Sequence, residues 1–220
     1  CSVFENSMEV FLSDESVDDL VQKCARVNIF NIRIEKSFDI ETHGDAACEA
    51  ICASNPTFLS FKVDVCSYEI LKFIRRCLPE EGARINSLSL NFKSGGMLPL
   101  SYKELAVILA TPSLRLFCFK FRRFTADTSF FDCFAGNKTN LTFLRLKFTY
   151  INFHALLNVA KLGFIPELST LVLDKCLVSG VDLILIAEIL NFCRIHTLQM
   201  LTSLWVYTVS DIYLEPLARI

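Results

Sequence analysis

Glycine and proline are scarce in this 220-residue sequence, with 7 and 6 residues respectively. This scarcity excludes a collagen-like chain and a chain made mostly of loops. Disorder is excluded as well, because 52% of the residues are hydrophobic and only 21% are charged, whereas disordered chains are poor in apolar residues and rich in net charge. The sequence is that of an ordered chain with a core.

A basic excess is also missing, since 22 Lys and Arg residues face 24 Asp and Glu residues. Without a basic field, nucleic acid is not an expected partner. The longest apolar run, residues 181–190, is too short and too charged to span a bilayer, so we expect no membrane association. The first residues do not form a signal peptide. We expect a cytoplasmic protein and, because the chain begins at Cys1, a fragment of a longer one.

Catalytic and cofactor-binding motifs are absent: the sequence contains no GxxxxGK[ST], GxGxxG, HExxH, GxSxG or CxxC pattern. We therefore predict neither enzyme activity nor a cofactor. His43, Cys48 and Cys52 offer three zinc ligands, but a structural zinc site needs four and no fourth lies nearby in the sequence. We interpret Cys48 and Cys52 as the buried stripe of a helix.

Cysteine is frequent, with ten residues, but the positions do not suggest a disulfide framework. Most lie inside apolar-periodic stretches, among them Cys24, Cys77, Cys118 and Cys193. A free cysteine in such a place behaves as a small buried hydrophobic residue. We predict reduced thiols in an intracellular protein.

A repeat of about 28 residues runs through the chain. The clearest copy is LSTLVLDKCLVSGVDLILIAEILNF from Leu168, which has the pattern LxxLxLxxCxL followed by an apolar-periodic helix. Alternation places positions one, four and six on the inward face of a short strand. The seven repeats start near Val27, Phe58, Ile85, Leu114, Leu141, Leu168 and Ile195, and a degenerate unit covers residues 1–26. The predicted strands are Phe30–Arg33, Leu59–Val63, Ser87–Leu90, Arg115–Phe119, Thr142–Leu146, Thr170–Leu173 and Thr197–Met200, with an eighth near Met8–Leu12.

Helix signals follow the strands in the same phase. Ser101-Tyr-Lys-Glu104 has the spacing of a capping box, and Ser16 and Ser67 precede amphipathic runs. Pro56, Pro112 and Pro166 each end a helix before a strand begins. Since one unit cannot bury its own apolar face, the units must stack. We predict a single α/β solenoid over residues 1–220, a curved horseshoe with parallel strands on the concave face and helices on the convex face.

This pattern resembles the leucine-rich-repeat family, specifically the long repeats of the ribonuclease-inhibitor-like class. Some units are also similar to the cysteine-containing repeats of F-box proteins, as at Leu20–Cys24. In the family, Asn or Cys at position nine hydrogen-bonds the loop backbone of the neighbouring unit. Four of the position-nine residues here have side chains that can donate in this way, and the other three predict irregular loops. The donors are Cys66, Thr149, Cys176 and Ser203, and the exceptions are Glu35, Lys93 and Arg122.

Side chains at the outward strand positions line the concave face, where this family often binds its partners. The fourth and fifth repeats combine basic and large apolar residues there, as interface hot spots do. The alternative is a solvated basic strip that only keeps the sheet soluble. The candidate partner-binding residues are Leu116, Lys120, Arg122, Arg123, Phe143, Arg145 and Lys147.

The resemblance implies a non-catalytic scaffold for protein–protein interaction, with an acidic partner on the concave face. Related solenoids serve as protein inhibitors, sensor domains of immune receptors and substrate receptors of ubiquitin ligases. A Ran-type GTPase-activating solenoid is the alternative, with Arg122-Arg123 on one rim, and a nucleic-acid-binding surface comes third. The segment Ser210–Ile220 has little polar cover, so we expect further repeats or a partner subunit at that end.

Overall fold

The structure, a computed structural model, describes residues 7–13, 20, 27–78, 84–122, 124–135, 138–148, 150–201 and 204–205. It divides into two compact units, residues 1–114 and residues 115–220. We call them unit 1 and unit 2 and describe each by itself. The amphipathic run after Ser16, up to Arg26, and the C-terminal segment Ser210–Ile220 lie outside the described residues except for Leu20.

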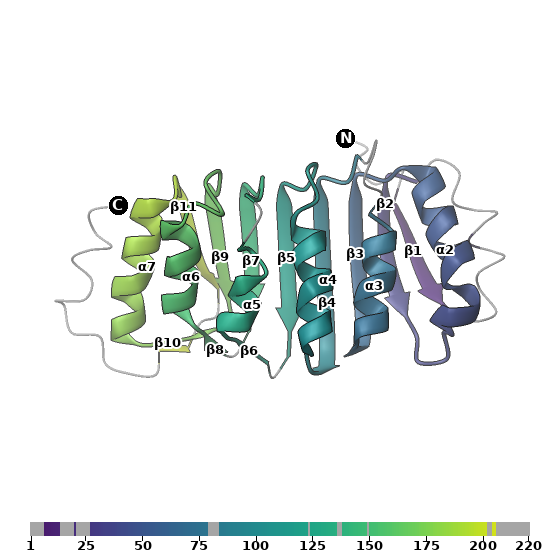
Figure 1. The fold of residues 1–220 in the computed structure, drawn as a ribbon, viewed down its shortest axis with the longest axis horizontal. Helices are drawn as coiled ribbons and strands as arrows, with labels where there is room; N and C mark the ends of the chain where they lie inside the picture. The colour runs from purple at the N-terminus through teal and green to yellow at the C-terminus, as the bar shows by residue number, and fades with distance from the viewer. Residues whose placement is uncertain are drawn as a thin grey trace. The chain divides into compact units, whose positions relative to one another are not determined.

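Unit 1 contains four parallel strands that pair in chain order, with helices on one face of the sheet (Figure 1). Phe30 of the second strand pairs with Leu59, and Leu59 pairs with Leu88, so the repeat length of unit 1 is 29. The strands are β1 (Ser7–Leu12), β2 (Ile29–Ile34), β3 (Phe58–Cys66) and β4 (Ser87–Gly95). The helices are α2 (Ile40–Ser54), α3 (Tyr68–Arg76) and α4 (Pro99–Leu109).

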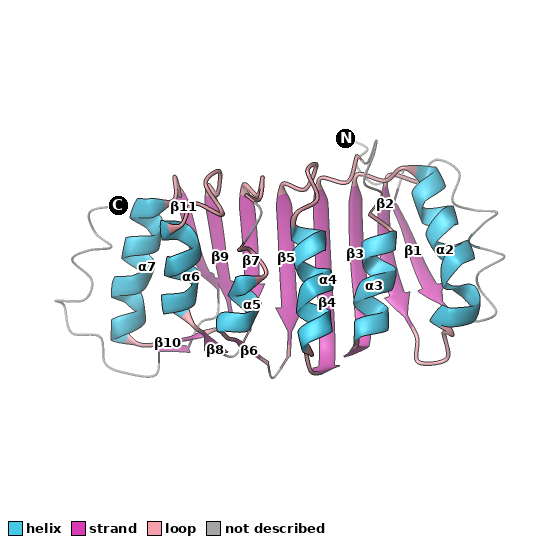
Figure 2. Ribbon diagram, viewed as in Figure 1, coloured by secondary structure: helices cyan, strands magenta, loops and turns pink. Residues whose placement is uncertain are grey.

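Unit 2 repeats this arrangement of strands and helices, which Figure 2 shows in magenta and cyan. Its repeat length is shorter. Leu144 pairs with both Phe117 and Leu171, and Leu171 pairs with Leu198, which gives a repeat length of 27. The main strands are β5 (Leu116–Phe121), β7 (Phe143–Lys147), β9 (Thr170–Asp174) and β11 (Thr197–Leu201). The helices are α5 (Thr128–Asp132), α6 (Phe153–Lys161) and α7 (Gly180–Phe192). Two short ladders pair β6 (Thr125–Ala126) with β8 (Tyr150–Ile151) and β10 (Leu177–Val178) with β12 (Leu204–Trp205).

The α/β class, the parallel pairing within each unit and all eight predicted strands are confirmed, with ends that differ by a few residues. The predicted start of the second repeat was wrong, because the register aligns Leu59, and not Phe61, with Phe30. The second repeat therefore starts at Pro56, two residues before Phe58. Consequently Asp64, and not Cys66, is the counterpart of Glu35 and Lys93. Lys93 lies within a nine-residue strand instead of an irregular loop.

The same hydrogen bond marks the start of successive strands and supports this phase. The backbone N–H of Thr57 donates to the carbonyl of Asn28, and that of Asn86 donates to the carbonyl of Thr57. In unit 2 the N–H of Thr142 donates to Arg115, and that of Ser169 donates to Thr142. These residues all occupy position two of their repeats. The hydroxyls of Thr57, Thr142 and Ser169 add a second bond to the same carbonyls.

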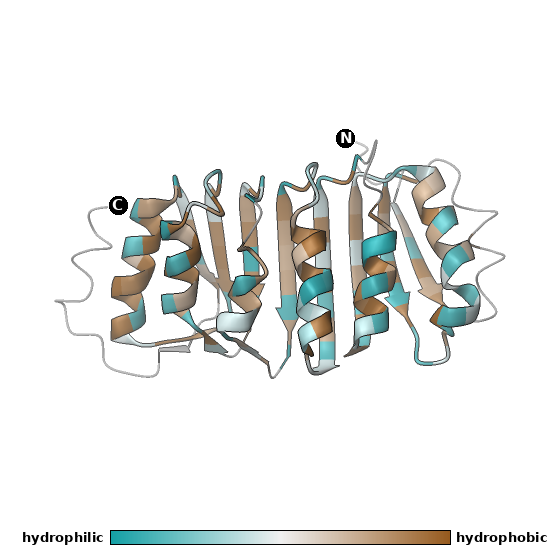
Figure 3. Cartoon of the chain, in the orientation of Figure 1, coloured by the Kyte–Doolittle hydropathy of each residue, from teal (hydrophilic) through white to brown (hydrophobic). Residues whose placement is uncertain are grey.

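The core of each unit lies between its strands and its helices, where alternate strand residues are buried. Figure 3 shows strands that are largely brown, hence apolar, and helices on which brown and teal residues alternate. Unit 2 fills much of this space with phenylalanine around the five-residue helix α5. Phe119 makes ring contacts with Phe117, Phe121, Phe130 and Phe148, at centroid distances of 5.3 to 6.4 Å.

Helix starts agree with the sequence prediction at one position and differ at another. Ser67 caps α3 as predicted, since its side chain accepts from the N–H of Ile70. The predicted capping box at Ser101 and Glu104 is wrong, because α4 begins at Pro99 and both residues lie buried inside it. Glu104 instead accepts from Arg75 of α3 at 3.1 Å. A capping box is present at Ser179 and Asp182 of α7.

Replacing Ser101 with Ala is expected to stabilise the protein. Ser101 is fully buried, and its hydroxyl has no hydrogen-bond partner within the described part of the chain. Removing an unsatisfied polar group and gaining helix propensity should raise the free energy of unfolding by about 0.5–1 kcal/mol. Ser179→Ala is the matched control, and it should lower that free energy by about 1 kcal/mol through loss of the cap. Urea unfolding followed by circular dichroism measures both, and equal losses would contradict the assignment of Ser101.

Candidate functional site

The candidate site lies on the strand face of unit 2 that points away from its helices, which we call the open face of unit 2. The register places its side chains in rows across neighbouring strands, which are about 4.8 Å apart. Leu116, Phe143 and Thr170 form one row, and Cys118, Arg145 and Val172 form the next. Lys120 lies beside Lys147 in a third row. Five of the seven predicted site residues therefore share one surface: Leu116, Lys120, Phe143, Arg145 and Lys147.

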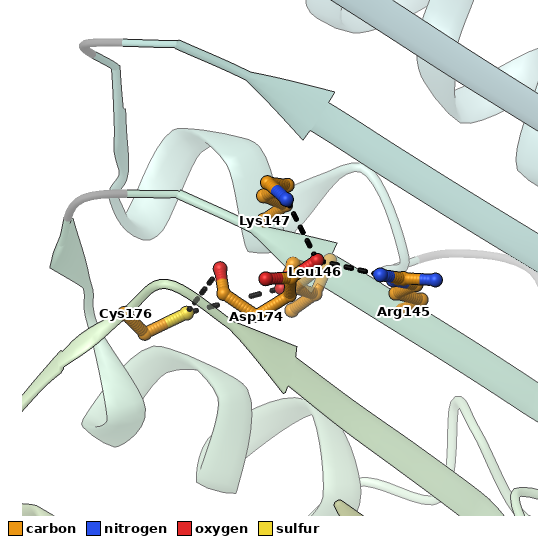
Figure 4. Close-up of polar contacts among 5 residues, drawn as sticks. All are labelled: Arg145, Leu146, Lys147, Asp174 and Cys176. Carbon is orange, nitrogen blue, oxygen red and sulfur yellow. Dashed lines mark hydrogen bonds and ion pairs between the residues drawn. The ribbon is translucent and has the colours of Figure 1, made fainter. Parts of the chain in front are cut away.

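Asp174, the last residue of β9, is the centre of the polar contacts on this face (Figure 4). Its Oδ2 accepts from Nη2 of Arg145 at 2.6 Å and from Nζ of Lys147 at 2.9 Å. The Asp174 side chain is only 4% exposed, whereas those of Arg145 and Lys147 are 41% and 24% exposed. One buried carboxylate thus holds two cations at the surface.

The charges at this cluster explain the ionisation of Asp174. Burial alone would raise the pKa of the carboxyl, but the hydrogen bonds from Lys147 and Arg145 outweigh burial and lower it. Asp174 is therefore ionised at neutral pH. The formal charge of Lys120, Arg145, Lys147 and Asp174 together is +2, so the surface remains basic after the internal pairing.

Apolar side chains adjoin the cations. Leu116 is 37% exposed, and Phe143, its neighbour on β7, is partly exposed. Val172 lies in the same row as Arg145, yet it is almost fully buried between its neighbours Arg145 and Gln199. Apolar side chains therefore lie next to the charged groups on this face.

The two remaining predicted residues lie elsewhere. Arg122 is exposed in the turn directly after β5, and Arg123 lies outside the described residues. The residue that sequence reasoning missed is Asp174, which is not among the predicted site residues. A signal was present: Lys147 and Asp174 have a sequence separation of 27, the repeat length of unit 2, so equivalent positions bring them together.

Cys176 supports the loop that follows β9 and fulfils the position-nine prediction. Its thiol lies 3.8 Å from the carbonyl oxygen of Leu146 in the preceding repeat and 3.5 Å from that of Asp174 (Figure 4). Burial raises the pKa of the Cys176 thiol to about 11, so the group stays a neutral donor. Cys176 therefore fixes the backbone on both sides of the ion cluster. The other position-nine donors of this unit, Thr149 and Ser203, lie outside the described residues.

Unit 1 has its own polar depression on the corresponding strand face. A cavity of about 260 Å³ is lined by Glu9, Asn31, Ile32, Arg33, Ser60, Lys62 and Asn91. Arg33 lies over the ring of Phe11 at 5.9 Å, and Lys93 pairs with Asp64 at 2.6 Å nearby. Opposite charges are mixed here, and the one apolar residue of the lining, Ile32, is almost fully buried, so the depression lacks the composition of a hot spot.

Metal ligation finds no support in the described ranges, where no group of three His, Cys, Asp or Glu side chains is arranged to hold an ion. His43, Cys48 and Cys52 all belong to α2 but form no such group. Among the helices described, none is long and apolar enough to cross a membrane. No protein-family model and no curated protein sequence matches this chain.

Proposed function

We propose that the chain is a leucine-rich-repeat solenoid of the ribonuclease-inhibitor-like class, and that the open face of unit 2 binds a protein partner without catalysing a reaction. The partner would present an acidic segment with one apolar anchor. The observation that carries this proposal is the pairing of Arg145 and Lys147 with the buried Asp174, beside the exposed Leu116 and the partly exposed Phe143.

The fixed positions of the two cations favour a binding site over a basic strip that is only solvated. A long basic side chain that is free in solution loses about 0.5–1.5 kcal/mol when an interface immobilises it. Asp174 already holds Arg145 and Lys147 in place, so much of this entropy is lost when the protein folds and not when the partner binds. A preorganised pair of cations is thus a better receptor for carboxylates than two mobile ones.

The pairing leaves Arg145 able to bind a further carboxylate. A guanidinium has five N–H donors, and the Asp174 contact uses Nη2 of Arg145. The remaining donors can hold a second carboxylate in a bidentate geometry that Lys cannot reproduce. The apolar anchor of the partner would pack on Phe143 and Leu116, which are neighbours across β5 and β7.

A displayed peptide library tests this function. We expect selection of random twelve-residue peptides against the full chain to enrich acidic sequences with one large apolar residue. Binding of a selected synthetic peptide, measured by fluorescence anisotropy, should weaken at least tenfold in Phe143→Ala and in Arg145→Ala, because truncation of a hot spot costs at least about 2 kcal/mol. Lys72→Ala, at an exposed position of α3, should leave the affinity unchanged.

Two controls complete the design. Arg145→Ala removes one of the donors to Asp174, so every titration is run well below the melting temperature of each variant. A single-stranded oligonucleotide replaces the peptide in a second titration series at two salt concentrations. Tight oligonucleotide binding with a steep salt dependence would favour the nucleic-acid alternative. Peptides that bind the two unit 2 variants as well as they bind the wild type would contradict the proposed surface.

A further inference from the structure

Three thiols meet between α2 and α3 of unit 1. Cys48 and Cys52 are one turn apart on α2, and Cys77 ends α3. Side-chain hydrogen bonding with both Cys52 and Cys77 affects the pKa of the Cys48 thiol, so the three thiols lie close together. Cys52 also places its Sγ 3.6 Å from the carbonyl oxygen of Arg76, the residue before Cys77. All eight described cysteines are free thiols in the structure.

Helix geometry decides which of these thiols can form an unstrained disulfide. Residues four apart on a helix have Cβ atoms about 5–6 Å apart, whereas a disulfide needs about 3.5–4.5 Å. A bond between Cys48 and Cys52 would therefore distort α2. Cys48 and Cys77 come from two packed helices, so their Cβ separation is not fixed by one helical turn. A bond between the helices is therefore free of the constraint that strains a Cys48–Cys52 bond.

Exposure differs among the three residues. Cys77 is fully buried and Cys48 nearly so, whereas Cys52 is partly exposed. The hydrogen bond with Cys52 lowers the pKa of Cys48, but the hydrogen bond with Cys77 and burial outweigh it and raise the pKa to about 12. The hydrogen bond with Cys48 and burial raise the pKa of Cys52 as well. Thiols of this kind react slowly with oxidants, because the thiolate is the reactive form.

We propose that Cys48, Cys52 and Cys77 form an oxidation site whose product is a Cys48–Cys77 disulfide that joins α2 to α3. Peroxide first oxidises the Cys52 thiol to a sulfenic acid and releases water. Cys48 then attacks the Cys52 sulfur, which forms a strained disulfide and releases a second water. Finally Cys77 attacks the Cys48 sulfur, Cys52 leaves, and the proton of Cys77 passes to Cys52.

The disulfide would join equivalent points of two successive repeats, since Cys48 and Cys77 lie one repeat length of unit 1 apart in the sequence. A cross-link of that loop length restricts the unfolded chain. Oxidation is therefore expected to raise the melting temperature by roughly 5–10 °C. Reduction with dithiothreitol should reverse the rise.

Disulfide mapping on the full chain tests the proposal. The protein is treated with hydrogen peroxide under native conditions, quenched with N-ethylmaleimide and digested without reduction. A protease that cleaves after Glu separates Cys48 from Cys52 at Glu49. We expect mass spectrometry to show the Cys48–Cys77 linked peptide as the main product, with Cys52 alkylated.

Variants separate the steps. Cys52→Ser should slow formation of the Cys48–Cys77 bond at least tenfold, and Cys77→Ser should trap the Cys48–Cys52 bond. Cys66→Ser, at the end of β3 in the same unit, is the matched control and should change neither product nor rate. Circular dichroism verifies that each variant is folded. Linkage of other cysteines first, or an unchanged rate in Cys52→Ser, would overturn the proposal.

Discussion

Phe119→Ala is expected to lower the free energy of unfolding by about 3–5 kcal/mol, the range for removing a buried Phe from a core. Phe119 is almost fully buried and contacts four other rings, including a stacked contact with Phe148 at 5.5 Å. The loss has two parts: the transfer free energy of the removed ring, and the cost of the cavity that it leaves. The surrounding rings are too rigid to fill that cavity. Urea unfolding monitored by circular dichroism measures the change.

The control for this prediction is another phenylalanine of unit 2 in a different environment. Phe192, at the end of α7, is 54% exposed, and its ring lies 5.4 Å from the ammonium of Lys161. Phe192→Ala should cost at most about 1 kcal/mol, the value of an exposed cation–π contact. Phe119→Leu keeps most of the volume and should cost less than Phe119→Ala. Equal costs for Phe119→Ala and Phe192→Ala would show that the ring cluster does not stabilise unit 2.

The strands could be predicted because each combines short alternation with a constant phase. The exact phase of the second repeat could not, because Leu59 and Phe61 are both apolar and a slip of two residues keeps every side chain on the same face. Pairing with β2, where Leu59 faces Phe30, resolves this ambiguity. The start of α4 was mispredicted for a different reason. Pro99 favours the first helical turn, so the helix begins two residues before Ser101.

Side-chain pairs between neighbouring repeats can be predicted only with the correct repeat length. With a repeat length of 29 in unit 1, equivalent positions bring together Asp64 with Lys93, Arg75 with Glu104, and Cys48 with Cys77. A mean period of about 28 conceals all three pairs. The buried ionised state of Asp174 needed more than the period, because the Arg145 contact is diagonal and depends on the twist and spacing of β7 and β9.

Asp174→Asn is expected to lower the free energy of unfolding by about 1.5–3 kcal/mol at neutral pH, the range for hydrogen bonds to charged groups. The pKa of Asp174 is lowered in the folded protein. Its contribution is therefore complete above the unfolded pKa of about 3.9 and is lost as the pH falls through the folded value. The difference between wild type and variant should shrink below about pH 4. Urea unfolding at a series of pH values checks this.

Asp45→Asn provides the comparison at a surface pair. Asp45 is 78% exposed and pairs with Arg76 on the helix side of unit 1. Exposed pairs contribute about 0–1 kcal/mol, so this variant should differ little from wild type at any pH. A double-mutant cycle between Lys147→Met and Asp174→Asn isolates the coupling of that pair. No coupling, or a difference that is constant with pH, would contradict the role given to Asp174.

Asp174→Asn also separates the two interpretations of the basic surface. The substitution raises the formal charge of the four-residue cluster from +2 to +3, which by itself would strengthen the binding of an acidic peptide. If Asp174 preorganises Arg145 and Lys147, however, both side chains are mobile in the variant and lose rotamer entropy when the peptide binds. We expect the selected peptide to bind at least threefold more weakly to Asp174→Asn at physiological salt. Stronger binding would mean that Asp174 competes with the partner for the two cations, and that the open face of unit 2 attracts acidic peptides by its charge alone.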